Sequence, residues 1–248
     1  MIKGIYFHNP KTAGTSIKKA LKLYENKILT ESSPCFAGQW KGTLNAQMFD
    51  FKFSRADFTK LLIHQEFGPD VWDNIFKFSF VRNPWDRYIS NWHWLTRKEK
   101  TYPLKGWKAR GWKGEDGNIS FKNFVEQTEK IYVRGPDGTK PFRQNGVYQH
   151  DKWHLWNQID HLKNKDGIIE LDFIGRFENL QEEFDDVCNK LLGEKIRLTH
   201  INHVGYYEDQ RLIPQPHYST HYTDELVEIV RQRCLPDIQA FGYEFEWE

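Results

Sequence analysis

A polar turn near the N-terminus is the first part of the chain that could do chemistry. The segment HNPKTAGTS, at residues 8–16, lies between a short apolar run and a stretch with helical spacing, so we expect it to join a strand to a helix. Such a turn can direct backbone N–H groups at an anion, and the helix N-terminus adds partial positive charge. It also supplies a point charge, hydroxyl donors and a glycine that allows close backbone approach: Lys11, Thr12, Thr15, Ser16 and Gly14. We interpret it as a phosphate-binding turn, with an ordinary polar turn and a solvated lysine as the alternative.

A second strand, turn and helix is expected at residues 78–92, FSFVRNPWDRYISNW. Arg82 stands at the expected end of the strand, where open α/β sheets place their ligand, and Ser90 lies about two turns into the helix. An arginine fork can hold two phosphate oxygens at once, whereas Arg87 could equally be a charge on the helix surface. Two such sites suit a ligand with phosphate groups at both ends. The Walker A pattern is absent, because the lysine of the first turn precedes its glycine.

These two segments resemble motifs of the sulfotransferases that use 3′-phosphoadenosine 5′-phosphosulfate (PAPS), in the branch that modifies carbohydrates. HNPKTAGTS is similar to the 5′-phosphosulfate loop and FVRNPWDRYIS to the 3′-phosphate motif, in the right order and about 70 residues apart. The likeness extends to FIGRFENLQEEFDDVC at residues 173–188 and to HYTDELVEIVRQRCLPDIQAFGYEF near the C-terminus; only the middle is poorly matched. The resemblance implies a P-loop-like α/β fold with a parallel β-sheet flanked by helices, no metal and no covalent enzyme intermediate.

The resemblance also implies a site for each end of the donor. The 5′-phosphosulfate would be held by Lys11, Thr12, Gly14, Thr15 and Ser16, and the 3′-phosphate by Arg82 and Ser90. Lys11 would in addition neutralise charge that develops on the leaving phosphate oxygen. Sulfuryl transfer resembles phosphoryl transfer in needing in-line positioning and electrostatic stabilisation, so a metal is not required.

The acceptor hydroxyl needs a base, and the sequence offers His64, the last residue of the apolar run LLIH at residues 61–64. We expect this run to be a strand, and the resemblance implies a histidine base at such a position. Histidine has a reference pKa of ~6.5 and can accept a proton near neutral pH. Glu66 is the rival base, or a group that orients His64. The alternative is a histidine that only closes a strand.

The remaining histidines do not form a recognisable metal site. Two pairs are four residues apart, His150 with His154 and His217 with His221, but no carboxylate or cysteine completes either set. We therefore expect no metal. His203 follows Asn202 in a segment whose likeness to the family is too loose to assign a role.

Strand-like runs and the helices between them must hold these side chains in place. We expect strands at residues 2–8, 61–64, 76–82 and 168–174, and helices that begin after the first turn, at Pro84, at Glu178 and near Thr223. Because a strand, a polar turn and a helix recur, the pattern favours a parallel sheet with covering helices in one domain, residues 1–248. Residues 97–149, with an amphipathic segment at 121–128, are expected to be an insertion over the sheet edge on the acceptor side.

The charge balance, the cysteines and the lack of long apolar stretches argue against a nucleic-acid-binding protein, a disulfide-rich protein and a membrane-spanning protein. Lys and Arg number 35 against 34 Asp and Glu, so a net charge of +1 provides no overall field that would attract nucleic acid or an anionic membrane. The three cysteines, Cys35, Cys188 and Cys234, have no paired spacing and are expected to be reduced thiols. No stretch approaches the ~20 apolar residues of a membrane span, and the N-terminus has no hydrophobic signal region. We therefore expect a cytoplasmic protein whose anion site is local.

The sequence thus predicts a sulfotransferase that moves a sulfuryl group from PAPS to a hydroxyl of a carbohydrate and releases 3′-phosphoadenosine 5′-phosphate (PAP). Residues 97–113, RKEKTYPLKGWKARGWK, combine basic groups with Tyr102, Trp107 and Trp112 and would either bind an anionic glycan or form a solvated loop. The identity of the acceptor and the oligomeric state stay open. Two alternatives are a kinase-like phosphotransferase and a glycan-binding protein without catalysis.

Overall fold

The fold is taken from a computed structural model, which describes residues 1–30, 55–96, 120–132, 155–199, 206–208, 211–213 and 216–248. The backbone divides into two compact units. The first comprises Met1–Asn83 with Asn157–His203, and the second comprises Pro84–Trp156 with Val204–Glu248. The single domain expected from the sequence stays a prediction.

The first unit is built on a parallel sheet of four strands, ordered β2-β1-β3-β4. The strands are β1 (Gly4–Phe7), β2 (Ile28–Thr30), β3 (Phe76–Val81) and β4 (Phe173–Arg176). Gly4 lies opposite Ile28 on one side and Phe76 on the other, and Phe78 lies opposite Phe173. The structure therefore confirms the parallel sheet, whose strands all end at one edge.

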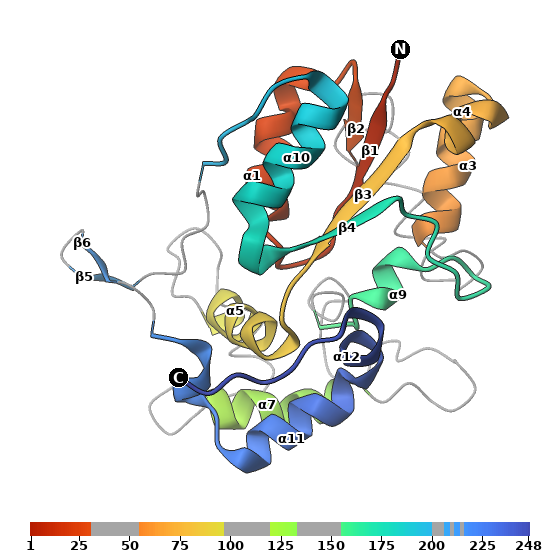
Figure 1. The fold of residues 1–248 in the computed structure, drawn as a ribbon. Helices are drawn as coiled ribbons and strands as arrows, with labels where there is room; N and C mark the ends of the chain where they lie inside the picture. The colour runs from red at the N-terminus through yellow and green to blue at the C-terminus, as the bar shows by residue number, and fades with distance from the viewer. Residues whose placement is uncertain (31–54, 97–119, 133–154, 200–205, 209–210, 214–215) are drawn as a thin grey trace. The chain divides into compact units, whose positions relative to one another are not determined.

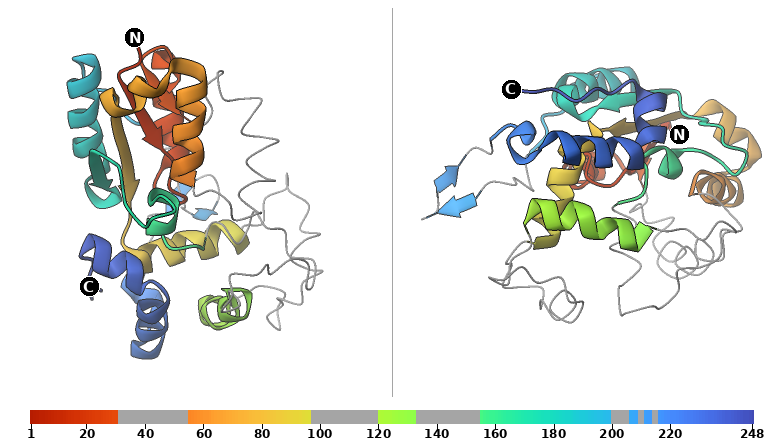
Figure 2. Two further views of the ribbon diagram at one scale, coloured as in Figure 1. Left: turned by 90° about the vertical axis from the view of Figure 1, so that its right-hand side faces the viewer. Right: turned by 90° about the horizontal axis from the view of Figure 1, so that it is seen from below.

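Helices cover both faces of this sheet (Figure 1). The helices α1 (Gly14–Leu21) and α10 (Leu180–Leu192) lie on one face, and α3 (Arg55–Phe67) lies on the other, as the edge-on view in Figure 2 shows. The shorter helices of this unit are η1 (Lys22–Tyr24), α4 (Pro69–Asn74), α9 (Ile159–Leu162) and η3 (Phe177–Asn179). The predicted P-loop-like α/β class, a parallel sheet between helices, is confirmed.

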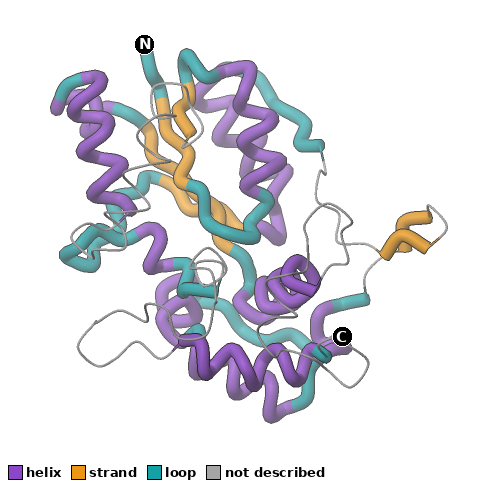
Figure 3. Tube along the Cα trace, turned by 180° about the vertical axis from the view of Figure 1, so that it is seen from behind, coloured by secondary structure: helices purple, strands orange, loops and turns teal. Residues whose placement is uncertain are grey.

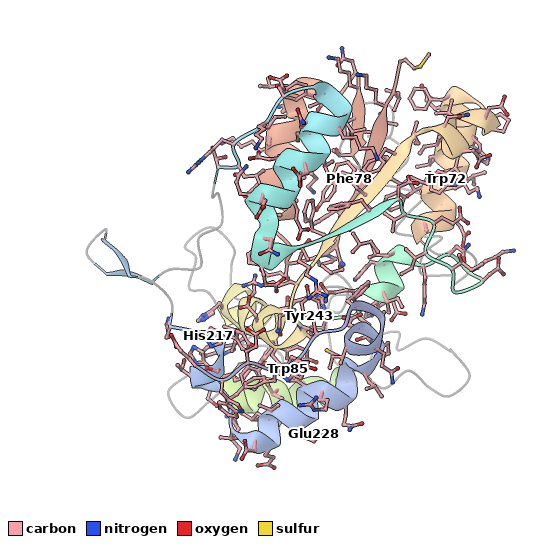
Figure 4. All side chains as sticks on the ribbon, in the orientation of Figure 1. Trp72, Phe78, Trp85, His217, Glu228 and Tyr243 are labelled. Atoms are coloured by element: carbon pink, nitrogen blue, oxygen red, sulfur yellow. The ribbon has the colours of Figure 1, made fainter. Side chains whose placement is uncertain are left out.

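Aromatic side chains fill the layer between the sheet and the helices. Phe78 is fully buried, and its ring centroid lies 5.5 Å from that of Tyr6. Figure 4 labels Phe78 on the α10 side of β3, where Phe184 of α10 joins the same core cluster. On the other face, the Phe7 and Trp72 rings pack edge to face at 6.1 Å. Burial of these large rings is what holds the helices onto the sheet.

Two of the three cysteines, Cys188 and Cys234, lie among the described residues, and both are free and buried. Burial raises the pKa of the Cys188 thiol to about 12, with a further rise from the nearby Asp185 and Glu194 carboxylates. Burial also raises the pKa of Cys234. Thiols of this kind stay protonated at neutral pH and are poor nucleophiles. Cys35 lies outside the described residues.

One predicted strand is a helix instead. Residues 61–64, LLIH, fall inside α3. The buried positions of that helix start before the run, at Ala56, Phe58, Thr59, Leu62 and Ile63, and their spacing is helical. Leu61 is 37% exposed, which a fully buried strand would not allow. The strand prediction for LLIH is therefore wrong, because a four-residue apolar run was read without the helical pattern around it.

A second predicted strand is correct only at its end. Residues 168–174 were expected to be extended throughout, but β4 begins at Phe173. Ile168 is 58% exposed, and Ile169 makes an isolated antiparallel bridge to Lys163. The first part of this run therefore pairs back on Lys163 across the turn at Lys165 and Asp166 and does not join the sheet.

The second unit is helical in its larger part, as the tube in Figure 3 shows. Its helices are α5 (Pro84–Thr96), α7 (Phe121–Tyr132), η4 (Tyr218–His221), α11 (Asp224–Arg233) and α12 (Leu235–Phe241), and its strands β5 (Tyr206–Glu208) and β6 (Arg211–Ile213) form a small antiparallel pair. The predicted starts at Pro84 and after Thr223 are confirmed, and the Thr223 hydroxyl caps α11 by accepting from the Leu226 N–H.

Trp85 holds the second unit together. Its indole N–H donates to the Val227 carbonyl at 3.0 Å, and its own carbonyl accepts from the Tyr222 hydroxyl at 2.9 Å. Arg87, one turn into α5, is only 1% exposed, so the surface position considered for it is wrong.

Of the predicted insertion at residues 97–149, the structure describes α7 and the residue before it. No helix in the described ranges is both long and apolar enough to span a bilayer.

Candidate functional site

The turn after β1 has an unusual backbone. Lys11 and Ala13 adopt left-handed conformations with φ of 71° and 60°, which for residues other than glycine costs of order 1–3 kcal/mol each. The Thr12 hydroxyl donates to the Asn9 carbonyl at 2.8 Å and closes the turn from within. Alternating backbone conformations of this kind turn successive N–H groups toward one point, which suits an anion. Thr12 is fully buried and supports the shape of the turn.

The turn leads directly into the N-terminus of α1. Ala13 is the cap residue and makes no side-chain hydrogen bond to the first helical turn, which contains no acidic residue. The first backbone bond of the helix runs from the Ile17 N–H to the Ala13 carbonyl at 3.1 Å. The first N–H groups of a helix generally lack an acceptor within the helix, and Thr15 and Ser16 lie in the first turn of α1. An anion is the ligand that such a helix end favours.

Gly14 is required for a reason other than the one expected. A Cβ built on Gly14 would overlap the imidazole of His8, whose ring lies against the first residue of α1. The φ angle of Gly14 is not in the left-handed region. The absence of a side chain at this position therefore makes room for His8, which connects the end of β1 to the helix N-terminus.

Arg82 follows β3 and reaches the same turn. Its Nη1 donates to the carbonyl of Lys11 at 3.3 Å, and the centre of its guanidinium lies 4.0 Å from the centroid of the Phe177 ring. The two segments singled out in the sequence are thus in direct contact. Arginine can stack on an aromatic face and can also bind a phosphate through its planar fork of N–H groups.

The residues that hold this part of the chain were not found from the sequence. The side-chain amide of Gln158, which is fully buried, pairs with both backbone groups of Arg82, and the Glu178 carboxylate accepts from the Asn83 N–H at 2.6 Å. Phe177 and Glu178 lie in the segment FIGRFENLQ that resembles the family, which is a signal that could have pointed to them. Gln158 belongs to no motif, and no sequence signal could have revealed it.

His64 and Glu66 lie elsewhere in the first unit. The helix α3 runs back along the sheet, and α4 then leads into Phe76, the first residue of β3 (Figure 1). One turn before His64, the Lys60 ammonium pairs at 3.1 Å with Glu170, which precedes β4. The last turn of α3 is therefore at the end where the strands begin, whereas the Lys11 turn and Arg82 follow the ends of β1 and β3. The argument that placed His64 at the end of a strand beside these loops is wrong.

The other predicted positions fall in the second unit or outside the described residues. Ser90 lies in α5, is 5% exposed and belongs to the second unit, so its contact with a 3′-phosphate stays a prediction. His217 accepts at Nδ1 from the Ser219 N–H and is part of a local turn. Among the described residues no group of three or more His, Cys, Asp or Glu could hold a metal. Segments singled out in the sequence that are not described include 97–113, with its aromatic residues, His150, His154 and His203.

Comparison with known protein families matches residues 3–244 to the sulfotransferase family. The chain belongs to the sulfotransferase family. It is also 26% identical over 130 residues to an uncharacterized protein of Archaeoglobus fulgidus, a match that covers 52% of this chain and 78% of that protein. Sulfuryl transfer to a hydroxyl acceptor is the activity of such a family, and the Lys11 turn and Arg82 are the parts of this sulfotransferase that could hold an anionic donor.

Asn9 gives an independent sign that the turn is built for a ligand. Its side chain is completely buried, yet neither its amide nitrogen nor its amide oxygen has a hydrogen-bond partner among the described residues. A buried polar group without a partner costs about 1–3 kcal/mol, so such groups are rare away from functional sites. Together with the uncapped helix N-terminus and Lys11, this amide fits a sulfotransferase donor with several anionic oxygens.

We predict that Asn9→Leu makes the free protein more stable. Leucine has nearly the same size and removes both unpaired polar atoms, so the free energy of unfolding should rise by about 1–3 kcal/mol. Urea unfolding of the ligand-free protein measures this change, with Thr12→Val as the opposite control because it removes the bond that closes the turn. A loss of stability in Asn9→Leu would show that the amide is hydrogen-bonded in the free protein.

Proposed function

We propose that this sulfotransferase takes a sulfuryl group from PAPS and transfers it to a hydroxyl of a carbohydrate. The observation that carries the proposal is the contact between Arg82 and the carbonyl of Lys11. It joins an anion-binding turn at one strand end to an arginine at the next, and PAPS has anionic groups at both its 5′ and 3′ positions. The end of a parallel sheet is also where open α/β folds bind nucleotides.

The described residues would hold the donor and neutralise its charge. The oxygen of the acceptor hydroxyl attacks sulfur and its proton passes to a general base, while the bond from sulfur to the bridging phosphate oxygen breaks and PAP leaves with the electron pair of that bond. Lys11 and the N–H groups at the start of α1 would stabilise negative charge on the leaving oxygen, which is the electrostatic assistance that group transfer requires. Arg82 would hold the 3′-phosphate and thereby fix the direction of the 5′ end.

The carbohydrate acceptor is proposed from the resemblance of the two motifs and from composition. Basic and aromatic residues alternate at 97–113, and such a segment would contact sugar rings and their anionic substituents. A lipid-linked sugar, a small glycoside and a simple alcohol are all acceptors that share the required hydroxyl. An assay across these classes therefore distinguishes them.

The first prediction for this function is donor selectivity. PAP at saturating concentration should raise the melting temperature of the protein, since it binds only the folded state, and ATP with Mg²⁺ should not. Transfer of ³⁵S from labelled PAPS to a panel of glycans, glycosides and alcohols should then identify the acceptor class. Stabilisation by ATP and Mg²⁺ alone would favour a kinase-like phosphotransferase, and oligosaccharide binding without transfer would favour a glycan-binding protein.

The second prediction concerns Arg82→Ala. Charge-assisted hydrogen bonds to a phosphate contribute about 1.5–3 kcal/mol, so the variant should bind PAP roughly 10- to 150-fold more weakly in calorimetry. Arg197→Ala is the matched control, because Arg197 is an exposed arginine of the same unit and should leave the affinity unchanged. Parental affinity in a folded Arg82→Ala protein would contradict the assignment.

The third prediction concerns the proposed histidine base. Loss of a general base costs ~10²- to 10⁴-fold in turnover. Because the end of α3 lies where the strands begin, we expect His64→Ala to lose much less than this and to keep its donor-induced thermal shift. Glu66→Gln, two residues on in the same helix, is also expected to lose much less than 100-fold in turnover and to keep the thermal shift. A loss of 100-fold or more in His64→Ala with donor binding intact would establish the role that the sequence suggested, and the same loss in Glu66→Gln alone would assign the base to Glu66.

A further inference from the structure

Gln158 makes an unusual pair of hydrogen bonds with the backbone of Arg82. The Arg82 N–H donates to Oε1 of Gln158 at 2.8 Å, and Nε2 of Gln158 donates to the Arg82 carbonyl, also at 2.8 Å. The two residues are 76 positions apart, and the Gln158 side chain is fully buried at the start of α9. One amide thus satisfies both backbone groups of a single residue.

The hydrogen bonds of Gln158 continue the pairing of β3 one residue beyond the end of the sheet. The ladder between β3 and β4 finishes with Val81 opposite Arg176, so Arg82 is the first residue beyond it. A side-chain amide has the same donor and acceptor as a peptide group, and Gln158 supplies the pair that a longer neighbouring strand would have given. The next residue is fixed as well, because the Asn83 N–H donates to Glu178 at 2.6 Å.

The same arrangement fixes the direction of the Arg82 side chain. With the backbone held by Gln158, the guanidinium extends over the Phe177 ring at 4.0 Å and donates to the Lys11 carbonyl at 3.3 Å. An arginine side chain has ~2 kcal/mol of rotamer entropy to lose when it is immobilised. Fixing it before the ligand arrives reduces this loss at the binding step, which strengthens binding.

We propose that Gln158 is a positioning residue that presents Arg82 to the 3′-phosphate of the donor and so sets the preference for nucleotides that carry this group. The inference rests on the proposed function, since it needs a donor with a 3′-phosphate. Gln158 itself touches no part of the donor in this account. It acts through the backbone of Arg82, and its contribution is confined to the affinity that the 3′-phosphate adds.

The test compares two ligands that differ by that phosphate, PAP and adenosine 5′-phosphate. Calorimetry gives the dissociation constant of each ligand. The dissociation constant of adenosine 5′-phosphate divided by that of PAP measures the contribution of the 3′-phosphate. In Gln158→Met, which keeps the volume but removes both hydrogen bonds, this ratio should fall about three- to tenfold, while the affinity for adenosine 5′-phosphate stays within about twofold. A general loss of stability would instead weaken both ligands together.

Gln181 provides a matched control within the same unit. Its amide also clamps a backbone segment, accepting from the Leu198 N–H at 2.9 Å and donating to the Ile196 carbonyl at 3.1 Å. Gln181→Met should therefore lose comparable stability in urea unfolding but keep the parental ratio. If Gln158→Met does not fold, Gln158→Asn takes its place, because it is uncharged and too short by one methylene to make both bonds.

The outcomes separate the two proposals. A parental ratio well above one that falls in the Gln158 variant, and not in Gln181→Met, supports the positioning role. A parental ratio that is unchanged in a folded Gln158 variant overturns the positioning role and leaves the proposed donor standing. A parental protein that binds both ligands equally overturns both, since no 3′-phosphate would then be recognised.

Discussion

Parallel pairing of β1 with β3 is the interaction on which the candidate site depends. The ladder sets Phe7 opposite Ser79, and the Ser79 hydroxyl donates a further bond of 2.7 Å to the Phe7 carbonyl. Both strands run in one direction and end at one edge. The residues that follow them, Lys11 and Arg82, are therefore close enough for a direct hydrogen bond. A register slip by one residue would turn each side chain to the opposite face and separate them.

The turn after β1 stores conformational free energy that the neighbouring structure offsets. Two non-glycine residues hold left-handed conformations, and strain of this kind persists only where the surroundings over-determine the backbone. The Thr12 hydroxyl fixes the turn from within, and Arg82 holds its Lys11 carbonyl from outside. With the buried amide of Asn9, these features give a site whose shape exists before any ligand binds.

The sequence predicted β1, β3 and the first half of β4, but not β2, and it also singled out the two anion segments, because these features depend on local patterns. Apolar runs and the turn residues between them identified β1, β3 and α5 with bounds close to those observed. The strand prediction for residues 61–64 was wrong because so short an apolar run cannot distinguish a strand from one side of a helix. The role of His64 as base stays a prediction, but the strand that supported it is part of the helix α3. Gln158 lay beyond any pattern, because a single amide that pairs with a distant backbone leaves no periodic signal.

The packing of His8 against Gly14 makes these two positions mutually dependent. A mutagenesis library that varies residue 14 alone should favour glycine among its folded members, because any other side chain must displace the His8 ring. One that varies residues 8 and 14 together opens further solutions, in which a small residue at 8 accompanies a side chain at 14. Which residues are tolerated at one of these positions therefore depends on the residue at the other, and redesign of the turn has to vary both together.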